Sequence, residues 1–440
     1  PVVVTGSKLV DNYVRTFINF NGYDTPGHYI DSITSNQINF RIPFEATTVQ
    51  TPLQFTSVPT AGPFIVRVND TGTNTVPFIV LGCSALVFND GVNRVNAINT
   101  QTNALQGTFS LASQPLSVTI DPEGVKVYFL TAGSDQMSVV DTNKNQVVAT
   151  IPVGPSPGGI AVTYHKYNNL YVTNTTKGTV TCYDNQTFAQ KAVITVGQKP
   201  TKMAISYDWE WLMVVNTADN NLSVIQISTN TQTAVLPLGN APSDIIASWM
   251  DRKMFVINTG DNTISGISVG DKIVTGTVPI GNGPWRMAYA QNGGKVFVLN
   301  QGDGTVSVIG EGDTSLRSTI IMGNQPMGIC TDYDNNYVYV AQYGDNNVAV
   351  LNNDTENLNM LVPVGQGPSD VAFINNPRVG KYVYVTNRLS SSVTVITSED
   401  NSNYQPTLLA HSIVTTIPLS DKPRRIIMQD LSRDTTLFNP

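Results

Sequence analysis

The chain contains 440 residues, of which 41% are hydrophobic and 13% are charged, and its formal net charge is −7. A chain of this length can bury a large core, and its glycine and proline contents are ordinary for a folded protein. Its Lys and Arg residues form no run, which argues against a nucleic-acid groove, because such a groove needs a basic surface to neutralise phosphates. The longest apolar runs, such as residues 77–82, are far too short to span a bilayer.

The N-terminal part of the chain differs from the rest. It shows no basic segment followed by an apolar one, so we expect no signal peptide, and we favour removal of an initiator Met over cleavage after export. Residues 1–84 contain strand-like runs at 13–20, 37–44, 52–58 and 63–69, and we expect the last to pair with 76–82. We expect a small β domain or an attachment arm here, with an ordinary accessory sheet as the alternative.

Residues 85–430 are built from a repeat. Eight segments of similar pattern can be superimposed, and "LYVTNTTKGTVTCYD" at 170–184 is the third of them. Between them prolines recur every 42 or 43 residues, at Pro115, Pro157, Pro200, Pro242, Pro284, Pro326 and Pro368. The step to Pro423 is 55 residues, because the eighth unit carries an insertion around 398–411. A period this regular indicates a repeat architecture.

Each repeat unit contains four short runs rich in Val, Ile, Thr and aromatic residues, separated by Gly, Asn, Asp or Pro. Four antiparallel strands in about 42 residues are typical of one blade of a β-propeller, whose faces are buried only against neighbouring blades. The sequence "YVTN" at 171–174 and 384–387, with the links 153–157 and 364–368, resembles the YVTN-repeat β-propeller family. The resemblance implies an all-β propeller fold, and it says little about function because the motif consists of strand and turn residues.

The number of blades follows from the two ends of the repeat. The first unit has only three strands, at 86–115, whereas residues 423–430 form a first strand with no blade of its own. Pairing the two closes the ring, leaves no exposed sheet edge and gives eight blades. Seven blades, the commoner number in the family, is the alternative, as is a first strand at 77–82. Residues 431–440 are expected to form a C-terminal tail.

Residues that commonly support metal, redox or catalytic chemistry are few and scattered. The cysteines lie in or beside apolar strands and are expected to be buried free thiols, namely Cys83, Cys182 and Cys330. The histidines fall in three different regions, which argues against a shared site, namely His28, His165 and His411. The Asp- and Asn-rich loops at 259–263, 301–305 and 343–347 lack the spacing of a calcium loop and are better explained as hairpin turns. We therefore predict no metal and no cofactor.

The positions that follow the repeated prolines supply one concentrated polar set. At the start of the first strand of each blade, they are expected to border the mouth of the central channel. This channel-mouth ring consists of Lys202, Asp244, Trp285, Arg286, Asp370, Arg424 and Arg425. Some propellers are lactonases or lyases that use carboxylates there, so the ring is a candidate polar site. The alternative is that its charges cap loop ends and pair with each other.

A second candidate site is a band of aromatic residues on the opposite face. The turns between the first and second strands of blades three to five carry Tyr164, Tyr167, Trp209, Trp211 and Trp249. Large aromatic side chains are enriched where a protein partner or a sugar binds. The alternative is that these rings cover the ends of apolar strands.

Three functions are compatible with these features. The lack of a catalytic set, the low charge, the Asn- and Thr-rich loops and the extra N-terminal region favour a non-enzymatic interaction scaffold, most of all a virion component such as a phage tail, fibre or capsid-associated protein. Its partners would be other proteins of the assembly, reached through residues 1–84. The second hypothesis is a secreted or surface-layer-type propeller that binds protein or a cell-surface glycan. The third is an enzyme of the lactonase or lyase type. The first two place the protein in a virion or at an extracellular surface.

Overall fold

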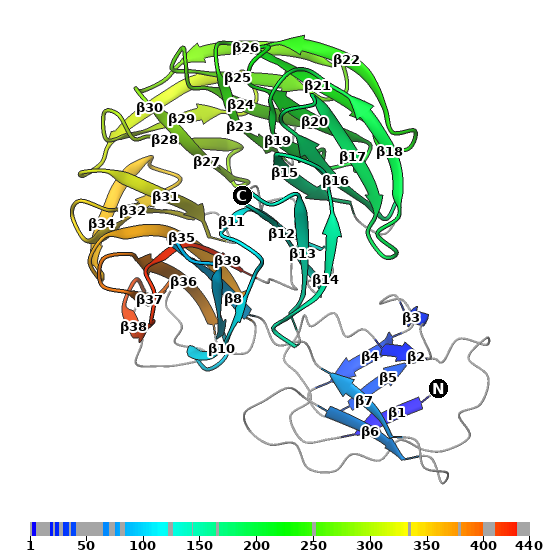
Figure 1. Ribbon diagram of the computed structural model, residues 1–440. Helices are drawn as coiled ribbons and strands as arrows, with labels where there is room; N and C mark the ends of the chain where they lie inside the picture. Colours follow the sequence, from blue (N-terminus) through cyan, green and yellow to red (C-terminus); the bar gives the residue numbers. More distant parts are fainter. Residues whose placement is uncertain are drawn as a thin grey trace.

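A computed structural model describes residues 84–121, 126–142, 144–163, 167–248, 252–332, 336–376, 380–398 and 410–428, together with the backbone of seven short strands before residue 80. Every regular element in these residues is a β-strand. Eight four-stranded sheets stand in a ring around a central axis, which confirms the predicted eight-bladed propeller (Figure 1). Nowhere in the described part does the chain form a helix with the length and apolar character that a membrane span requires.

Each blade is an antiparallel sheet whose first strand lies innermost (Figure 1). Blades one to four are formed by β39 (Pro423–Met428), β8 (Ser84–Asn89), β9 (Arg94–Asn99) and β10 (Ala104–Ser110); β11 (Pro115–Ile120), β12 (Lys126–Thr131), β13 (Gln136–Asp141) and β14 (Gln146–Pro152); β15 (Pro157–Val162), β16 (Asn169–Asn174), β17 (Thr179–Asp184) and β18 (Gln190–Thr195); and β19 (Pro200–Ile205), β20 (Trp211–Asn216), β21 (Asn221–Gln226) and β22 (Thr231–Pro237). Blades five to eight are formed by β23 (Pro242–Ala247), β24 (Lys253–Asn258), β25 (Thr263–Ser268) and β26 (Ile273–Pro279); β27 (Pro284–Ala290), β28 (Lys295–Asn300), β29 (Thr305–Gly310) and β30 (Ser315–Ile321); β31 (Pro326–Thr331), β32 (Tyr337–Gln342), β33 (Asn347–Asn352) and β34 (Asn357–Pro363); and β35 (Pro368–Asn376), β36 (Gly380–Asn387), β37 (Ser392–Thr397) and β38 (Ile413–Pro418).

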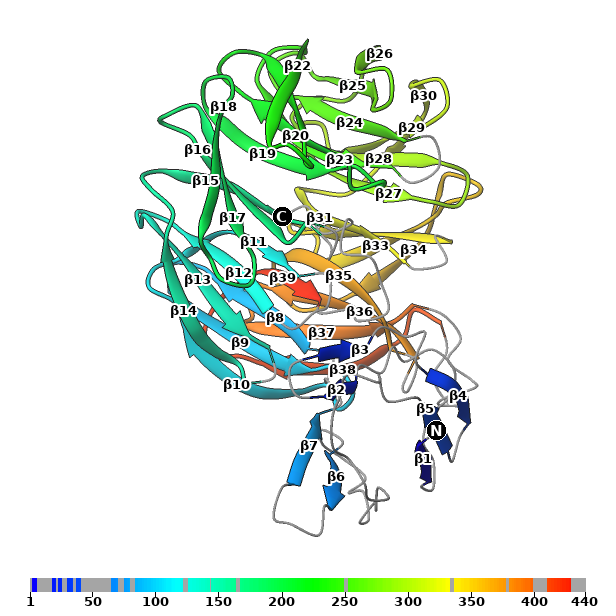
Figure 2. The same ribbon diagram turned by 90° about the vertical axis from the view of Figure 1, so that its right-hand side faces the viewer.

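The ring is closed by β39, the last strand among the described residues. In blade one, β39 pairs antiparallel with β8, with Ile426 opposite Val87 (Figure 2). This pairing makes the seven-blade alternative wrong. The alternative first strand at 77–82 is also wrong, because β7 (Thr75–Ile79) pairs instead with β6 (Ile65–Asn69), the hairpin predicted for that part of the chain.

Short strands also occur in the N-terminal part of the chain. β1 (Val2–Thr5), β5 (Gln37–Phe40) and β4 (Ile30–Thr34) form a three-stranded sheet, and β2 (Ile18–Phe20) pairs with β3 (Tyr23–Thr25). The run expected at 52–58 lies outside the described residues. An attachment role for residues 1–84 stays a prediction.

The core of the propeller lies between blades. Eight buried clusters of apolar side chains occur in the described residues, and each draws its members from two neighbouring blades. Across the closing seam, Val87 and Ile426 of blade one pack with Tyr384 of blade eight. Because the middle strands are buried on both faces, they read as continuous apolar runs, as in β36. The outer strands alternate between exposed and half-buried side chains, as in β14.

The repeated Gly and Asn residues of the sequence motif contact each other. The Asn that ends the second strand donates hydrogen bonds to the third strand; Asn300 Nδ2, for example, lies 3.0 Å from Thr305 Oγ1 and 2.9 Å from Ser307 Oγ. The same Asn fills the space beside the Gly of the link to that blade, because a Cβ at Gly281 would lie 2.5 Å from Asn300 Nδ2. Gly197, Gly239 and Gly365 face Asn216, Asn258 and Asn387 in the same way. The motif therefore locks the link between blades onto the hairpin.

Long side chains of the second strands also join several of the blades to the next. Tyr171 Oη of blade three donates to Asn230 Oδ1 of blade four at 2.7 Å, and Lys295 Nζ of blade six donates to Asn353 O of blade seven at 2.6 Å. At the closing seam, Tyr384 of blade eight donates to Asn103 of blade one. These bonds fix neighbouring blades at the turns between their third and fourth strands.

Candidate functional site in the central channel

Every blade begins its first strand with a β-bulge. The pairing register of the first and second strands shifts after the leading proline in all eight blades, for example between Pro200 and Lys202 and between Pro368 and Asp370. A bulge re-aims the side chains around it. As a result, the first and second residues after the proline have different surroundings.

The second position after the proline carries the charged set. In chain order from blade two it is occupied by Ser117, Gly159, Lys202, Asp244, Arg286, Gly328, Asp370 and, on the closing strand, Arg425. The five charged side chains are buried or half-buried, although they come from strands spread along more than half of the chain. We call Lys202, Asp244, Arg286, Asp370 and Arg425 the charged ring.

The carboxylate of Asp370 joins three blades. Arg286 Nη1 of blade six donates a hydrogen bond of 2.6 Å to Asp370 Oδ1 of blade eight. The other oxygen, Oδ2, accepts a bond of 3.2 Å from the backbone N–H of Ile426 in blade one. Blade seven lies between the first two and supplies Gly328, where a Cβ would come within 2.7 Å of Asp370 Oδ1. The missing side chain therefore lets Arg286 reach across a whole blade.

The other members of the charged ring act on each other electrostatically. Desolvation lowers the pKa of Lys202 to about 8, with Arg425 and Arg286 acting in the same direction and Asp244 opposing them. Desolvation raises the pKa of Asp244 against the opposite effect of Lys202. The nearby guanidinium of Arg286, followed by desolvation, lowers the pKa of Arg425 to about 10. The five charged groups thus lie close enough to influence one another in one partly buried region, with three cations and two carboxylates.

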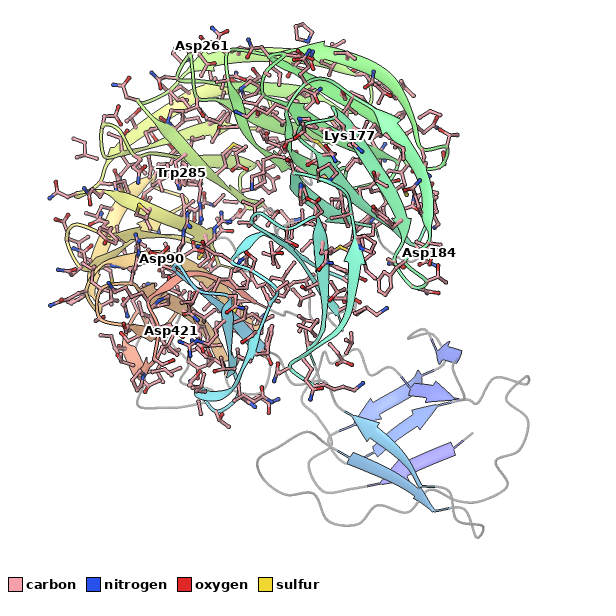
Figure 3. All side chains as sticks on the ribbon, viewed as in Figure 1. Asp90, Lys177, Asp184, Asp261, Trp285 and Asp421 are labelled. Carbon is pink, nitrogen blue, oxygen red and sulfur yellow. The ribbon has the colours of Figure 1, made fainter. Side chains whose placement is uncertain are left out.

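The other two members of the predicted channel-mouth ring lie one residue earlier, at the rim. Trp285 is 47% exposed (Figure 3), and the side chain of Arg424 is 56% exposed. Arg424 Nη1 lies 3.9 Å from Asp90 Oδ1, whereas Asp90 binds Arg388 more closely. The structure thus divides the predicted set into a ring that is buried or half-buried and a pair of exposed residues.

The described members of the aromatic band are engaged within the fold. Trp209 and Tyr167 are half-buried against the core cluster between blades three and four, and Tyr167 Oη also lies 3.2 Å from Glu210 Oε2. Trp211 packs on the next cluster, and Lys272 Nζ lies 3.9 Å from its ring centre. Tyr164 and Trp249 lie outside the described residues. A partner or glycan surface at this band stays a prediction.

The Asp residues of the hairpin loops bind backbone amides. Asp261 Oδ2 accepts from Asn240 N at 2.5 Å, and Asp303 and Asp345 accept from the corresponding link residues at 2.8 and 2.7 Å. Their carboxylates therefore hold the links to the hairpins. Among the residues that the structure describes, no group of three or more His, Cys, Asp or Glu side chains is arranged to hold a metal ion.

Cys182 and Cys330 are free thiols, and burial raises the pKa of both, that of Cys182 to about 11. A raised pKa makes a thiol a poor nucleophile, so neither residue is suited to covalent catalysis. Of the histidines, only His411 is described, and it is buried against Tyr337 and Tyr339. Cys83, His28 and His165 lie outside the described residues.

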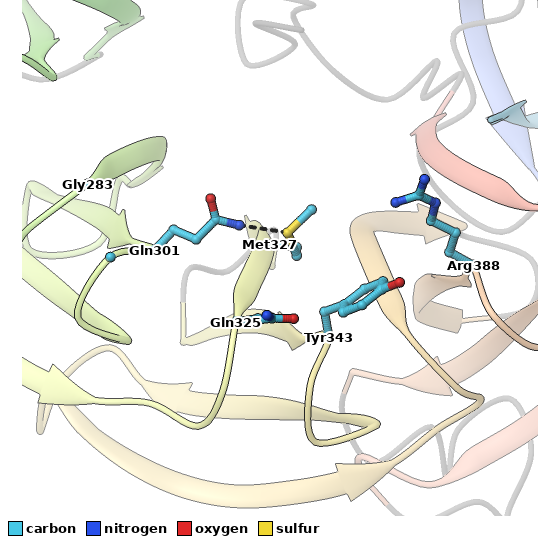
Figure 4. A pocket seen from close by; sticks show the side chains of 7 residues that line it. Gly283, Gln301, Gln325, Met327, Tyr343 and Arg388 are labelled. Atoms are coloured by element: carbon cyan, nitrogen blue, oxygen red, sulfur yellow. Dashed lines mark hydrogen bonds between the residues drawn. The ribbon is translucent and has the colours of Figure 1, made fainter. Parts of the chain in front are cut away.

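A cavity of about 610 Å³ is lined by hairpin and link residues of blades six to eight, and the sequence did not predict it. Its walls include Gln301, Gln325, Met327, Tyr343 and Arg388 (Figure 4). Gln301 Nε2 donates to Met327 Sδ at 2.8 Å. These residues look like ordinary hairpin and link residues in any single repeat. Only a comparison of the same position across all blades would have marked them.

Comparisons with known proteins support the fold but assign no family and no function. No family model and no curated protein sequence matches the chain. Dihydro-heme d1 dehydrogenase NirN, solved in complex with DHE, has a TM-score of 0.65 and 14% identity over 79% of this chain and 75% of that one. AztD from Citrobacter koseri has a TM-score of 0.60 and 13% identity, covering 79% of this chain and 98% of that one. At such identities the likeness shows an eight-bladed propeller alone.

The expectation of a virion component acting as an interaction scaffold is wrong. The structural neighbours include a dehydrogenase and AztD, and neither is a virion protein. The features used for that expectation have a local explanation in the fold. Asn and Thr are frequent because they join the strands of each blade, as Asn300 and Thr305 do. These residues therefore carry no information about a larger assembly.

Proposed function

We propose that the protein is a ligand-binding propeller that holds a small organic anion in its central channel. The observation that carries this proposal is the excess of one cation in the charged ring, where Lys202, Arg286 and Arg425 face Asp244 and Asp370. A charge in a weakly hydrated site is costly unless a partner compensates for it. A carboxylate arriving from the channel would add one negative charge, so the ring and its ligand together would be neutral.

The details of the ring support the same proposal. Asp370 is engaged by Arg286 and by the Ile426 N–H, so this carboxylate already has two partners. Desolvation raises the pKa of Asp244, although Lys202 and Arg286 act in the opposite direction, so this carboxyl group offers the cations less negative charge than an ordinary aspartate does. Arginine suits such a site because its planar guanidinium can bind a carboxylate with two parallel hydrogen bonds.

The test is a titration of the full chain with acetate and with sulfate, followed by calorimetry. We expect binding to the native protein and at least a tenfold weaker affinity in Lys202→Gln and in Arg425→Gln. Lys177→Gln is the matched control, because Lys177 is an exposed lysine on a hairpin of blade three (Figure 3). If neither anion binds, or if Lys177→Gln weakens binding as much as Lys202→Gln does, the proposal is wrong.

We propose binding without turnover. Proton NMR spectra of the ligand, taken before and after prolonged incubation with the protein, are expected to be identical. New resonances that depend on Lys202 or Asp244 would instead indicate catalysis in the ring. An extracellular location and protein partners reached through residues 1–84 also stay predictions.

We also infer that the chain is a divergent YVTN-repeat propeller. The contact between the link Gly and the hairpin Asn supports this, since it gives both letters of the motif a shared physical role, as at Gly365 and Asn387. A sequence profile built from the eight single blades should match YVTN repeats of other proteins better than it matches propellers of other families. An equal match to the other families would contradict the inference.

A further inference from the structure

The hairpins between the second and third strands differ between blades three to five and blades six to eight. The residue that follows the second strand is Thr175, Thr217 or Thr259 in blades three to five. These hydroxyl groups serve the framework, as when Thr217 Oγ1 donates to Pro242 O at 2.8 Å. In blades six to eight the same position holds the long side chains of Gln301, Tyr343 and Arg388, and all three line the cavity of about 610 Å³.

The first position after the proline changes on the same side. It holds Gly158, Thr201 and Ser243 in blades three to five but Trp285 and Met327 in blades six and seven. Trp285 immediately precedes Arg286 of the charged ring. Two residues that line the cavity lie close to the ring positions in sequence: Met327 directly precedes Gly328, and Gly283 lies three residues before Arg286.

Arg388 is held in place at the far wall of the cavity. Its guanidinium donates to Asp90 of blade one, and Figure 4 shows it on the same side of the cavity as the ring of Tyr343. An arginine has five N–H donors, so a bond to one carboxylate leaves others for a ligand. Gln301 and Gln325 add amide groups that can donate and accept.

We propose that this cavity binds the ring of an aromatic carboxylic acid whose carboxylate lies in the charged ring. This inference rests on the proposed anion site and names the ligand class that it takes. Tyr343 offers an aromatic face to the cavity, and the sulfur of Met327 also favours contact with an aromatic ring. The two glutamines and Arg388 can bind a polar substituent on that ring. The volume falls within the range usual for sites that bind small molecules.

The test compares 4-hydroxybenzoate with acetate, using calorimetry on the full chain and its variants. We expect the native protein to bind 4-hydroxybenzoate at least tenfold more tightly than acetate. Tyr343→Ala should remove that preference and leave the affinity for acetate unchanged, whereas Tyr343→Phe should retain most of the preference. Lys202→Gln should weaken the binding of both acids. Unchanged thermal unfolding of each variant would show that the fold is intact.

The outcomes separate the two proposals. Binding of acetate with no preference for 4-hydroxybenzoate, or a preference that Tyr343→Ala does not alter, overturns the present inference alone. Failure of both acids to bind overturns the anion site, and this inference with it.

Discussion

Arg286 of blade six forms a 2.6 Å ion pair with Asp370 of blade eight, although a complete blade lies between them. The pair exists because blade seven contributes Gly328, where a Cβ would lie 2.6 Å from the Cα and 2.7 Å from the Oδ1 of Asp370. A repeat protein has thus used a glycine at one position to connect two blades that do not touch through their sheets.

Replacing this glycine should break the connection. In Gly328→Ala the added methyl group displaces Asp370, which leaves a largely buried carboxylate and a guanidinium without their mutual bond. We expect the free energy of unfolding to fall by about 1–3 kcal/mol, as measured by urea denaturation. Gly270→Ala is the control, because a Cβ at Gly270 would meet nothing within 4 Å. Equal stability of the two variants would contradict this account.

Anion binding should depend on pH through Lys202. Since desolvation lowers the pKa of this amine to about 8, the ring keeps its third cation below pH 8 and loses it above. We expect the affinity for acetate to be constant from about pH 6.5 to 7.5 and to decrease as the pH rises past 8. Lys202→Gln should bind weakly and without that decrease. A decrease that persists in the variant would assign the titration to another group.

The contact between the link Gly and the hairpin Asn should be sensitive to one methyl group. A Cβ at Gly281 would lie 2.5 Å from Asn300 Nδ2 and 2.7 Å from Thr305 Oγ1, and both atoms are held by hydrogen bonds. We expect Gly281→Ala to cost about 1–3 kcal/mol of stability in thermal or urea unfolding. Gly107→Ala, where the surrounding space is open, should change stability much less. Similar losses in both would show that the contact is unimportant.

The bond from Tyr384 to Asn103 should help to hold the ring closed, since it joins blade eight to blade one. We expect Tyr384→Phe to lower the free energy of unfolding by about 1 kcal/mol, the usual net value of such a bond. A double-mutant cycle with Asn103→Ala isolates the interaction, because it subtracts the change in stability that each substitution causes independently of the other side chain. Strictly additive losses would mean that the two side chains do not interact.

Burial of His411 should make the protein less stable in mild acid. Desolvation holds the pKa of this imidazole below its usual 6.5, so the unfolded chain takes up a proton first as the pH falls. The contribution of His411 to the free energy of unfolding is therefore fully present above about pH 6.5 and decreases as the pH falls below it. His411→Asn retains a residue that tolerates the positive φ of 55° and should show a smaller loss between pH 7.5 and 5.5. An equal loss in both proteins would assign the effect to other groups.

Much of the fold could be predicted because each blade repeats the same physical solution. The even spacing of prolines gives the first strands, and the unpaired run at 423–430 already indicates how the ring closes. The buried ring could be predicted for the same reason, since Lys202 and Arg286 occupy one position of the repeat. The sequence does not separate Trp285 and Arg424 from the ring, because the bulge between adjacent positions has no sequence pattern of its own.

The cavity and the biological role were harder to reach from the sequence. Tyr343 and Arg388 lie in hairpins where almost any side chain is compatible with the fold, so strand patterns do not distinguish them. They line one cavity only because their blades are neighbours in the closed ring. The virion prediction was wrong because the Asn and Thr residues on which it relied are needed to build every blade and do not indicate a larger assembly.

The closing strand also determines when the molecule can become complete during synthesis. Blades two to seven can each form from one continuous stretch of about 42 residues, but β8 near residue 84 must wait for β39 at residues 423–428. Such a distant pairing makes the final step of folding intrinsically slow. Until then, β8 presents an open sheet edge on the nascent chain, where strands of other molecules can add. Synthesis of β39 therefore protects β8, more than 300 residues earlier in the chain, from intermolecular pairing.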